Sequence, residues 1–243
     1  REFELTGDDA LVKESERWLK REKAVIAGVD HALYFSDVEV AEINALLPEA
    51  DARAIPLYTL EPQPVARAAT EHPELLFVAG FNHPPNIDAA DWLVSNILPL
   101  IQDRVPDVRL HIAGSNPSRA VLDLASDSVT VHGYVSDERL LELYGRACCA
   151  VVPLRFGAGV KGKVLEAIQY GVPLVTTAVG AEGIPDAQDI MAIGRDEAGI
   201  ADRVVDAIQS QSSAGDAHGS WLEHYFSPAR ARAMLQAVVA QRD

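Results

Sequence analysis

The feature that most constrains the fold of this 243-residue chain is a regular alternation of short apolar runs and longer amphipathic stretches. Helical spacing of apolar residues marks the amphipathic stretches, and a last one closes the chain. Runs rich in Val, Ile and Leu are predicted to be strands at 31–35, 52–57, 74–80, 108–114, 128–133, 148–154, 172–177 and 189–194. Continuously apolar strands separated by helices are typical of a parallel sheet covered on both faces. The pattern therefore predicts an α/β fold with a doubly wound parallel sheet.

One stretch departs from this alternation and predicts a domain boundary. Residues 58–74 are rich in proline and polar side chains, which is typical of a linker. Two strands precede it, too few for an independent sheet, whereas six follow it. We therefore divide the chain into 1–60, a remnant of a second domain, and 61–243. Because the chain begins with Arg1 and not Met, it is expected to be a fragment or a processed product.

Local chemistry predicts several boundaries of helices and loops. Ser36, followed by Glu39, fits a capping box, and Ser136 precedes two first-turn acids. Asn86, after two prolines, is predicted to be the N-cap of its helix. The polar stretch 210–220, "SQSSAGDAHGS", is predicted to be a mobile surface loop.

Composition narrows the class of partner. The net charge of −15 argues against a nucleic acid or an anionic membrane as main partner, so membrane contact is expected to be peripheral at most. Two cysteines, adjacent at 148 and 149, are predicted to be small buried side chains and allow no disulfide framework. No apolar run reaches the roughly 18 residues of a membrane helix, and from this sequence we expect no signal peptide. These features predict a cytoplasmic protein.

The segment "RFGAGVKGKVLEAIQYGVPLVTT", residues 155–177, matches two phosphate-binding patterns imperfectly. A P-loop requires Ser or Thr after its Lys to hold Mg²⁺, and Val164 occupies that position. The dinucleotide pattern G-x-G-x-x-G normally follows the first strand of its sheet, with an acid ending the second strand. Here it follows the fourth strand of the downstream unit, and the acid at the matching count, Glu182, lies in a loop. Both interpretations are disfavoured.

A third interpretation rests on geometry. The glycine-rich turn follows the strand 148–154 and leads into a helix whose first-turn amides suit a phosphate. Lys163 and Glu166 lie three residues apart on a face away from the apolar stripe of Val164, Leu165, Ala167 and Ile168. The amides and the ammonium suit a diphosphate, and the carboxylate suits a ribose diol. The alternative is a solvated Lys–Glu pair worth about 0.3–0.5 kcal/mol, and spacing alone leaves both possibilities open.

The sequence also resembles a known family. "GAGVKGKVLEAIQYGVPLVTTAVGAEGI" is similar to the donor-site segment of group 1 retaining glycosyltransferases, glycosyltransferase family 4, which have the GT-B fold. "FVAGFNHPPNIDAADWLVSNILPLI", "PDVRLHIAGSNP" and "VTVHGYVSDERLLELYGRACCAVVPL" resemble the family's other donor-domain units in order, and "ADAR", "IPLY" and the Ser36–Glu39 motif resemble the end of its acceptor domain. The resemblance implies that 61–243 is a nucleotide-sugar donor-binding domain and 1–60 the end of an acceptor domain.

The resemblance also implies an activity: retaining transfer of a sugar from a nucleoside-diphosphate sugar to a hydroxyl of a sugar or lipid-linked acceptor, in polysaccharide or glycoconjugate biosynthesis. It implies Glu166 as the ribose contact. The catalytic candidates are Lys163, Lys161 and Arg155. The other candidates for donor binding are Gly157, Gly159, Val160, His83, Asn86, Gly133 and Tyr134. No cluster has metal-ligand spacing, and we expect no metal and no cofactor, the nucleotide sugar being a substrate.

The fit to the family has one gap, which keeps other functions open. Many members carry a glutamate eight positions before Glu166, where this chain has Ala158. A sugar-nucleotide epimerase of the same fold is one alternative, and a non-catalytic nucleotide-sugar-binding module is another. The chain alone is expected to bind a nucleotide without transferring sugar, because most of the acceptor domain is absent.

Overall fold

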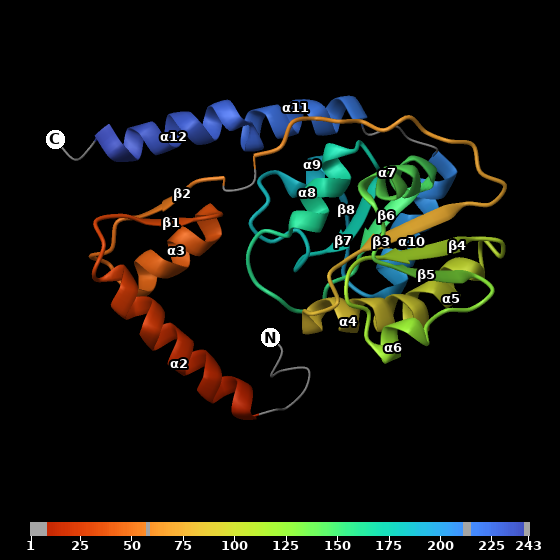
Figure 1. Ribbon diagram of the computed structural model, residues 1–243, viewed down its shortest axis with the longest axis horizontal. Coiled ribbons are helices and arrows are strands. Elements are labelled where there is room, and N and C mark those ends of the chain that lie inside the picture. Colours follow the sequence, from red (N-terminus) through yellow and green to blue (C-terminus); the bar gives the residue numbers. More distant parts are fainter. Residues whose placement is uncertain (1–8, 57–58, 211–214, 241–243) are drawn as a thin grey trace.

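The computed structural model describes residues 9–56, 59–210 and 215–240, and its centre is a six-stranded parallel sheet (Figure 1). The strand order is β5-β4-β3-β6-β7-β8. The strands are β3 (Glu74–Val78), β4 (Arg109–Ala113), β5 (Val129–Gly133), β6 (Cys149–Val152), β7 (Leu174–Thr177) and β8 (Ala192–Gly194). Every neighbouring pair is parallel, so the predicted doubly wound α/β sheet is confirmed.

Helices cover both faces of this sheet. One layer contains α4 (Pro84–Trp92), the π-helix η1 (Leu93–Ile97), α5 (Leu98–Gln102), α6 (Arg119–Leu122) and α10 (Glu197–Ser210). On the other face, α7 (Asp137–Arg146) and α8 (Gly162–Gln169) pack on the strands, and α11 (Gly215–Phe226) packs on α8. The short α9 (Ala187–Ile190) precedes β8 and contacts α11. The connecting helices change from one face of the sheet to the other where the strand order reverses, between β3 and β6.

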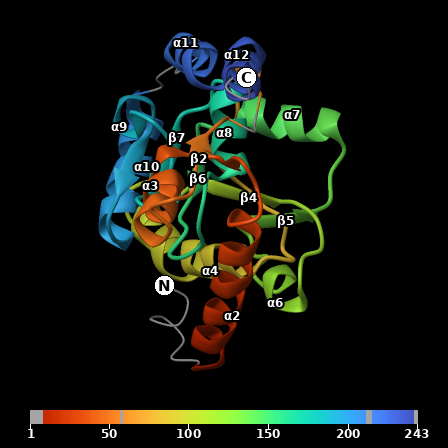
Figure 2. The same ribbon diagram turned by 90° about the vertical axis from the view of Figure 1, so that its left-hand side faces the viewer.

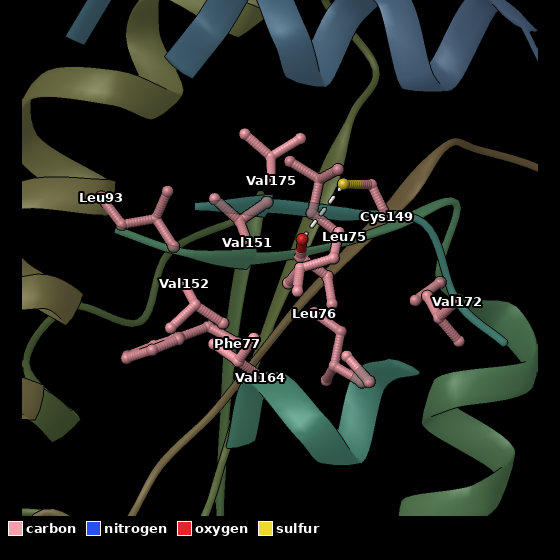
Figure 3. Packing of buried hydrophobic residues seen from close by; sticks show 14 of the residues in the cluster. Leu75, Leu76, Phe77, Leu93, Cys149, Val151, Val152, Val164, Val172 and Val175 are labelled. Atoms are coloured by element: carbon pink, nitrogen blue, oxygen red, sulfur yellow. Dashed lines mark hydrogen bonds between the residues drawn. The ribbon is translucent and has the colours of Figure 1, made fainter. Parts of the chain in front are cut away.

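The central strands are apolar because both of their faces are covered. All four residues of β6 and of β7 are buried, as are the first four of β3. Figure 3 shows side chains of these strands packed between the helical layers, with Val164 of α8 on one side and Leu93 of η1 on the other. Cys149 belongs to this core, where burial raises the pKa of its thiol to about 12. The predicted burial is confirmed for Cys149, while Cys148 is half-buried.

The N-terminal part of the chain forms a small unit of its own, which lies to one side of the six-stranded sheet in Figure 1 and faces the viewer in Figure 2. Helix α2 (Asp9–Ile26), β1 (Ala32–Tyr34), α3 (Asp37–Leu46) and β2 (Ala52–Ala54) enclose a minor core around Ile26, Ile43 and Ala52. The two strands pair in parallel as a sheet of their own. Ser36 is the N-cap of α3 as predicted, and its hydroxyl oxygen accepts from the Glu39 amide at 3.4 Å.

The predicted linker contains no helix or strand from 59 to 73, but it is held along its length by the second unit. Its amides donate to the C-terminal carbonyls of three helices: Leu60 to Phe226, Gln63 to Gln169, and Ala68 to Gly145. This segment, which we call the strap, crosses beside α11 in Figure 1 before it enters β3. The proposed domain boundary itself remains a prediction.

The prediction of a mobile loop at 210–220 is wrong for the residues that the structure describes. Ser210 ends α10 and residues 215–220 lie in α11, while 211–214 lie outside the described residues. His218 and Leu222 of α11 are buried, and Trp221 donates its indole N–H to the Pro185 carbonyl at 3.0 Å. Helix α12 (Pro228–Ala240) then runs on from α11 over the N-terminal unit (Figure 1).

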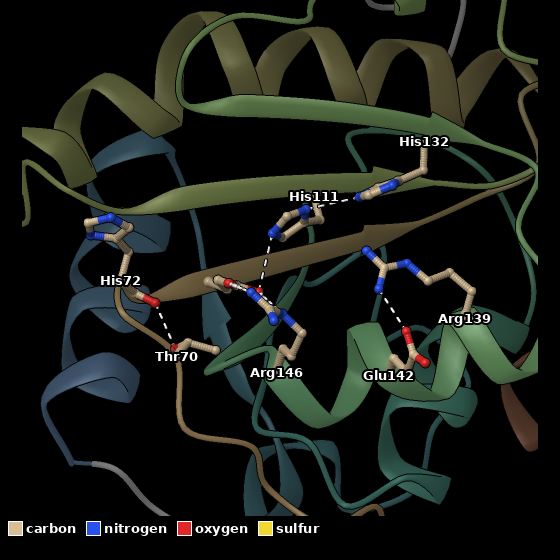
Figure 4. A network of polar contacts seen from close by, with 8 residues as sticks. Thr70, His72, His111, His132, Arg139, Glu142 and Arg146 are labelled. Atoms are coloured by element: carbon tan, nitrogen blue, oxygen red, sulfur yellow. Dashed lines mark hydrogen bonds and ion pairs between the residues drawn. The ribbon is translucent and has the colours of Figure 1, made fainter.

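A polar network links the sheet to α7 (Figure 4). Glu74, buried at the start of β3, is ion-paired with Arg146 of α7, and its carboxylate lies 3.2 Å from His111 Nε2. His111 Nδ1 lies 2.9 Å from His132 Nε2 on the neighbouring strand. Burial is the main cause that lowers the pKa of both histidines. His111 is therefore a half-buried sheet histidine within an ion-pair network.

Candidate functional site

The strand order reverses between β3 and β6, and a cavity of about 710 Å³ lies at this switch point. It is lined by segments that follow the carboxyl ends of four strands: 78–86 after β3, 113–115 after β4, 134–140 after β5 and 154–166 after β6. In open α/β sheets this is the position at which ligands bind. The cavity is therefore the candidate site, and the glycine-rich turn and the first turns of α8 supply part of its lining.

Helix α8 presents two faces, as its sequence predicts. Val164, Leu165, Ala167 and Ile168 are buried against the sheet. Lys163 and Glu166 are half-buried, and both line the cavity. Lys161 is the N-cap residue and provides no side-chain cap, so first-turn amides of this eight-residue helix remain available at the cavity. Anion-binding groups and a carboxylate thus share one side of the site.

The two lysines differ in their surroundings. Lys161 donates to the Gly159 carbonyl and lies 3.6 Å from a carboxylate oxygen of Glu182. Lys163 donates to the amide oxygen of Asn86, and among the described residues no carboxylate forms an ion pair with it. Burial and then the nearby Lys161 lower the pKa of Lys163 to about 8. The charge of Lys163 is consequently the less compensated of the two.

Glu166 lies one turn further along α8. Burial raises the pKa of its carboxyl, an effect that a hydrogen bond from Tyr144 opposes and the charge of Asp137 reinforces. Tyr144 belongs to α7, is buried, and packs its ring on Tyr170 with centroids 4.8 Å apart. The carboxylate of Glu166 is thus held at the cavity wall, where it can accept hydrogen bonds from a diol.

The prediction that Asn86 is an N-cap is wrong. Helix α4 begins at Pro84 with His83 as its N-cap residue, and no side chain caps it. Asn86 instead is 5% exposed, and its amide nitrogen donates to the Gly80 carbonyl at 2.7 Å. Its amide oxygen accepts from Lys163, which is why the side chain points inward.

Most of the predicted site residues meet at this cavity. Those among its lining are Lys161, Lys163, Glu166, Gly157, Val160, His83, Asn86 and Tyr134, together with Ala158, where the resembled family has a glutamate. Gly159 and Gly133 are outside the lining, although Gly133 directly precedes Tyr134. The ligand contacts proposed for all these residues remain predictions.

Arg155 is placed differently from the other candidates. Its guanidinium forms a two-point ion pair with Asp88 of α4 and lies over the Trp92 ring, 5.3 Å from the centroid. Trp92 in turn donates to Glu197 of α10 at 2.8 Å. The side chain is outside the cavity lining and joins the start of the glycine-rich turn to α4. Its predicted contact with a phosphate is untested.

We expect Arg155→Met and Asp88→Asn to lower the melting temperature and to couple in a double-mutant cycle by about 1 kcal/mol or less, because the pair is partly exposed. Both variants should change nucleotide affinity to a similar and small extent, since the pair acts through the turn. Calorimetry checks this. A tenfold loss for Arg155→Met with no loss for Asp88→Asn would instead indicate direct contact between Arg155 and the ligand.

Sequence reasoning did not select several residues of the site. Ser115, Asp137 and Leu140 also line the cavity, and Tyr144 supports Glu166 from behind. Asp137 was considered only as a first-turn acid of α7, a role that its position also fulfils. The available signal was positional: each follows, or lies in the first helical turns after, a strand that ends at the crevice.

Neither a group of possible metal ligands nor a membrane-spanning helix is found among the residues that the structure describes. In 9–56, 59–210 and 215–240, no three His, Cys, Asp or Glu side chains gather as a metal site requires. Within the same residues, no helix is both long enough and apolar enough to cross a membrane.

The fold and the site together define a Rossmann-like α/β domain, with its crevice at the switch point of the sheet. The family model described as Glycosyl transferases group 1 matches residues 72–210, which is more than half of the chain. The chain therefore belongs to the group 1 glycosyltransferase family.

Solved structures show the same fold at low sequence identity. A sucrose-phosphate synthase from Thermosynechococcus elongatus superposes with a TM-score of 0.75 at 22% identity, over 93% of this chain and 62% of that one. A pneumococcal O-GlcNAc transferase, GtfA, solved with UDP and GlcNAc, gives a TM-score of 0.70 at 16% identity, over 88% of this chain and 46% of that one. The described fold is thus that of the Rossmann-like domains of GT-B glycosyltransferases.

One curated relative is an uncharacterized 44.6 kDa protein in the cps region of Klebsiella pneumoniae. It is 29% identical over 116 residues, which cover 45% of this chain and 30% of the relative. The chain thus spans less than two thirds of the length of these relatives.

Proposed function

We propose that this chain is the donor-binding part of a retaining glycosyltransferase of family 4, which moves a sugar from a nucleoside-diphosphate sugar to an acceptor hydroxyl. The observation that carries the proposal is the arrangement of Lys163, Lys161 and Glu166 along one wall of the switch-point cavity. A diphosphate at the N-terminus of α8 would meet amides and ammonium groups, and the attached ribose would lie one turn further on, at Glu166. Tyr134 and Asp137 then lie toward the nucleobase end.

The chemistry needs charge stabilisation at the diphosphate. The bond between the anomeric carbon and the diphosphate oxygen breaks, and its electron pair leaves with that oxygen. The acceptor oxygen bonds to the anomeric carbon, and its proton passes to the departing diphosphate. Amides and lysines that are already in place stabilise the charge that develops on the leaving group. The chain supplies these groups without a metal, and the nucleotide sugar is a substrate.

Two of the relatives agree with this proposal. The pneumococcal transferase was solved with UDP and GlcNAc, which is consistent with a nucleotide-sugar donor here. The cps-region relative is consistent with a place in polysaccharide biosynthesis. The acceptor that we propose is a sugar or a lipid-linked sugar. The proposed division of the chain at residue 60 corresponds to the end of an acceptor domain followed by the donor domain.

The direct test is a binding and turnover comparison. Thermal shift with nucleosides, nucleoside diphosphates and their sugars should show stabilisation that requires the diphosphate. The best donor is then assayed with the full-length gene product, and NMR of the product should show that the anomeric configuration of the donor is retained. Epimerised donor in the absence of acceptor would replace the proposal with an epimerase, and inversion would refute retention. Failure of every nucleotide to stabilise the chain would refute donor binding.

We expect Glu166→Gln to weaken binding of the best nucleotide about tenfold or more, because a charge-assisted hydrogen bond is worth roughly 1.5–3 kcal/mol. Since burial raises the pKa of Glu166, affinity in the unchanged protein should also fall as the pH is lowered toward that pKa, and the variant should lose this dependence. Calorimetry across pH measures both effects. Glu71→Gln, an exposed change before β3, is the control. Unchanged affinity of Glu166→Gln would rule out the ribose contact.

A further inference from the structure

Asn86 joins two segments of the candidate site that are far apart in sequence. It lies in the first turn of α4, is buried, and donates its amide nitrogen to the Gly80 carbonyl, just beyond the end of β3. Because a carbonyl can only accept, this bond turns the amide oxygen of Asn86 toward the other side. There it accepts a hydrogen bond from the ammonium group of Lys163 on α8.

The other charged groups near Lys163 do not replace this contact. Lys161 repels it, and Glu182 is occupied as the ion-pair partner of Lys161. Glu166, His83 and Asp137 line the same cavity, yet within the described residues none forms an ion pair with Lys163. A neutral amide oxygen therefore orients this ammonium group while adding no negative charge.

We propose that Asn86 is a positioning residue, which points Lys163 into the cavity and leaves its positive charge uncompensated for an anionic ligand. The proposal rests on the proposed function for the nature of that anion, a diphosphate. It differs from the role predicted from the sequence, in which Asn86 contacts the donor itself. An aspartate here would hold the ammonium group but neutralise it, and an alanine would leave it without its acceptor.

The distinguishing property is the ionisation of Lys163 in the ligand-free protein. Asn86→Asp should raise the pKa of Lys163, because an opposite charge stabilises the ammonium form. Asn86→Ala should lower it, because a hydrogen bond to the charged form is lost. Both variants should nevertheless weaken anion binding at pH 7. A merely structural role for Asn86 would not move the two pKa values in opposite directions.

The experiment uses NMR titration of isotope-labelled lysine side chains, with the Lys163 signal assigned by its absence in Lys163→Arg. Inorganic pyrophosphate and nucleoside diphosphates are the anionic probes. We expect a pKa shift of about one unit or more in each direction, and pyrophosphate affinity about tenfold weaker in both variants. Asn96→Asp, the same charge change at an exposed position of η1, is the matched control and should leave both properties unchanged.

A double-mutant cycle identifies the route of the effect. Asn86→Ala should cost little pyrophosphate affinity in a Lys163→Met background, because the lysine that it positions is gone. An equal loss in both backgrounds would show direct contact between Asn86 and the ligand and overturn the proposal. A Lys163 pKa that is the same in Asn86→Asp as in the unchanged protein would overturn it as well, and this titration needs no ligand. If the Lys163 pKa shifts as expected but the protein binds no diphosphate, the proposed function is refuted. The role of the Lys163 charge in binding a diphosphate is then refuted as well.

Discussion

Replacing Gly114 with alanine is expected to prevent stable folding of the part of the chain that forms the six-stranded sheet. Gly114 follows β4 with φ of +144°, a conformation that side chains of L residues rarely adopt. A Cβ atom here would lie 1.8 Å from the carbonyl oxygen of Ala79 and 2.7 Å from its carbonyl carbon. Both obstacles are main chain at the end of β3, so no side-chain rotation relieves the clash. We expect a loss of more than about 4 kcal/mol, a large part of a typical domain's stability.

Chemical denaturation and the yield of soluble protein measure this effect. Gly80→Ala is a matched control, because Gly80 also lines the cavity but its added Cβ would meet only the Ser115 hydroxyl at 3.6 Å. The control should fold with a change of about 1 kcal/mol or less. A Gly114→Ala protein that melts within a few degrees of the unchanged chain would mean that the ends of β3 and β4 can separate.

Lys163→Met is expected to lower diphosphate affinity by about ten- to a hundredfold and leave affinity for the bare nucleoside nearly unchanged. The ammonium group acts on the anion and not on the base, and a partly buried charged hydrogen bond is worth roughly 1.5–3 kcal/mol. The unchanged protein should bind the diphosphate less tightly as the pH rises through about 8, where Lys163 loses its proton. Calorimetry with nucleoside and nucleoside diphosphate at several pH values checks both expectations. An equal loss for the two ligands would show that Lys163 acts through structure.

The same substitution should stabilise the folded chain at pH 7. The pKa of Lys163 is lowered to about 8 in the folded state from its ordinary 10.5. Folding therefore releases protons between these values, so the stability contribution of this group is complete above 10.5 and is lost as the pH falls through 8. Methionine removes that penalty, by about 1–3 kcal/mol at pH 7. Lys161→Met is the contrast, because it breaks the Glu182 ion pair and should lower the melting temperature.

The sequence predicts the central strands β3, β6 and β7 well because burial on both faces leaves a continuous apolar run. All eight predicted strands are present, including the short β8. Helix α11 was missed because Gly215 and Gly219 disfavour an isolated helix, so the local propensity indicated a loop. Contacts with α8 and the burial of His218 stabilise it instead, and a single sequence does not show which helices will meet.

The same limit applies to the candidate site. Strand ends predict which loops converge, and the resemblance to the glycosyltransferase family indicates Lys163, Glu166 and Tyr134 within those loops, all of which line the cavity. They do not predict which side chains pair across the crevice. Asn86 meets a lysine 77 positions away, and Arg155 meets Asp88 at a separation of 67. In both cases a contact with a residue distant in the sequence determines where the side chain lies, and the neighbouring residues do not indicate that contact.

The strap has a consequence for how the two parts of the chain can be rearranged or engineered. The amides of Leu60, Gln63, Val65 and Ala68 donate to carbonyls at the ends of α11, α8 and α7, so the length of the strap between these residues is fixed. Inserted or deleted residues would have to be absorbed at its ends, because a shift of register anywhere between Leu60 and Ala68 leaves those donors facing the wrong carbonyls. Gln169 and Tyr170, which receive two of its bonds, close the helix whose opposite end carries Lys163. The length of the strap therefore helps to set the position of Lys163, although the two are separated by the whole of α8.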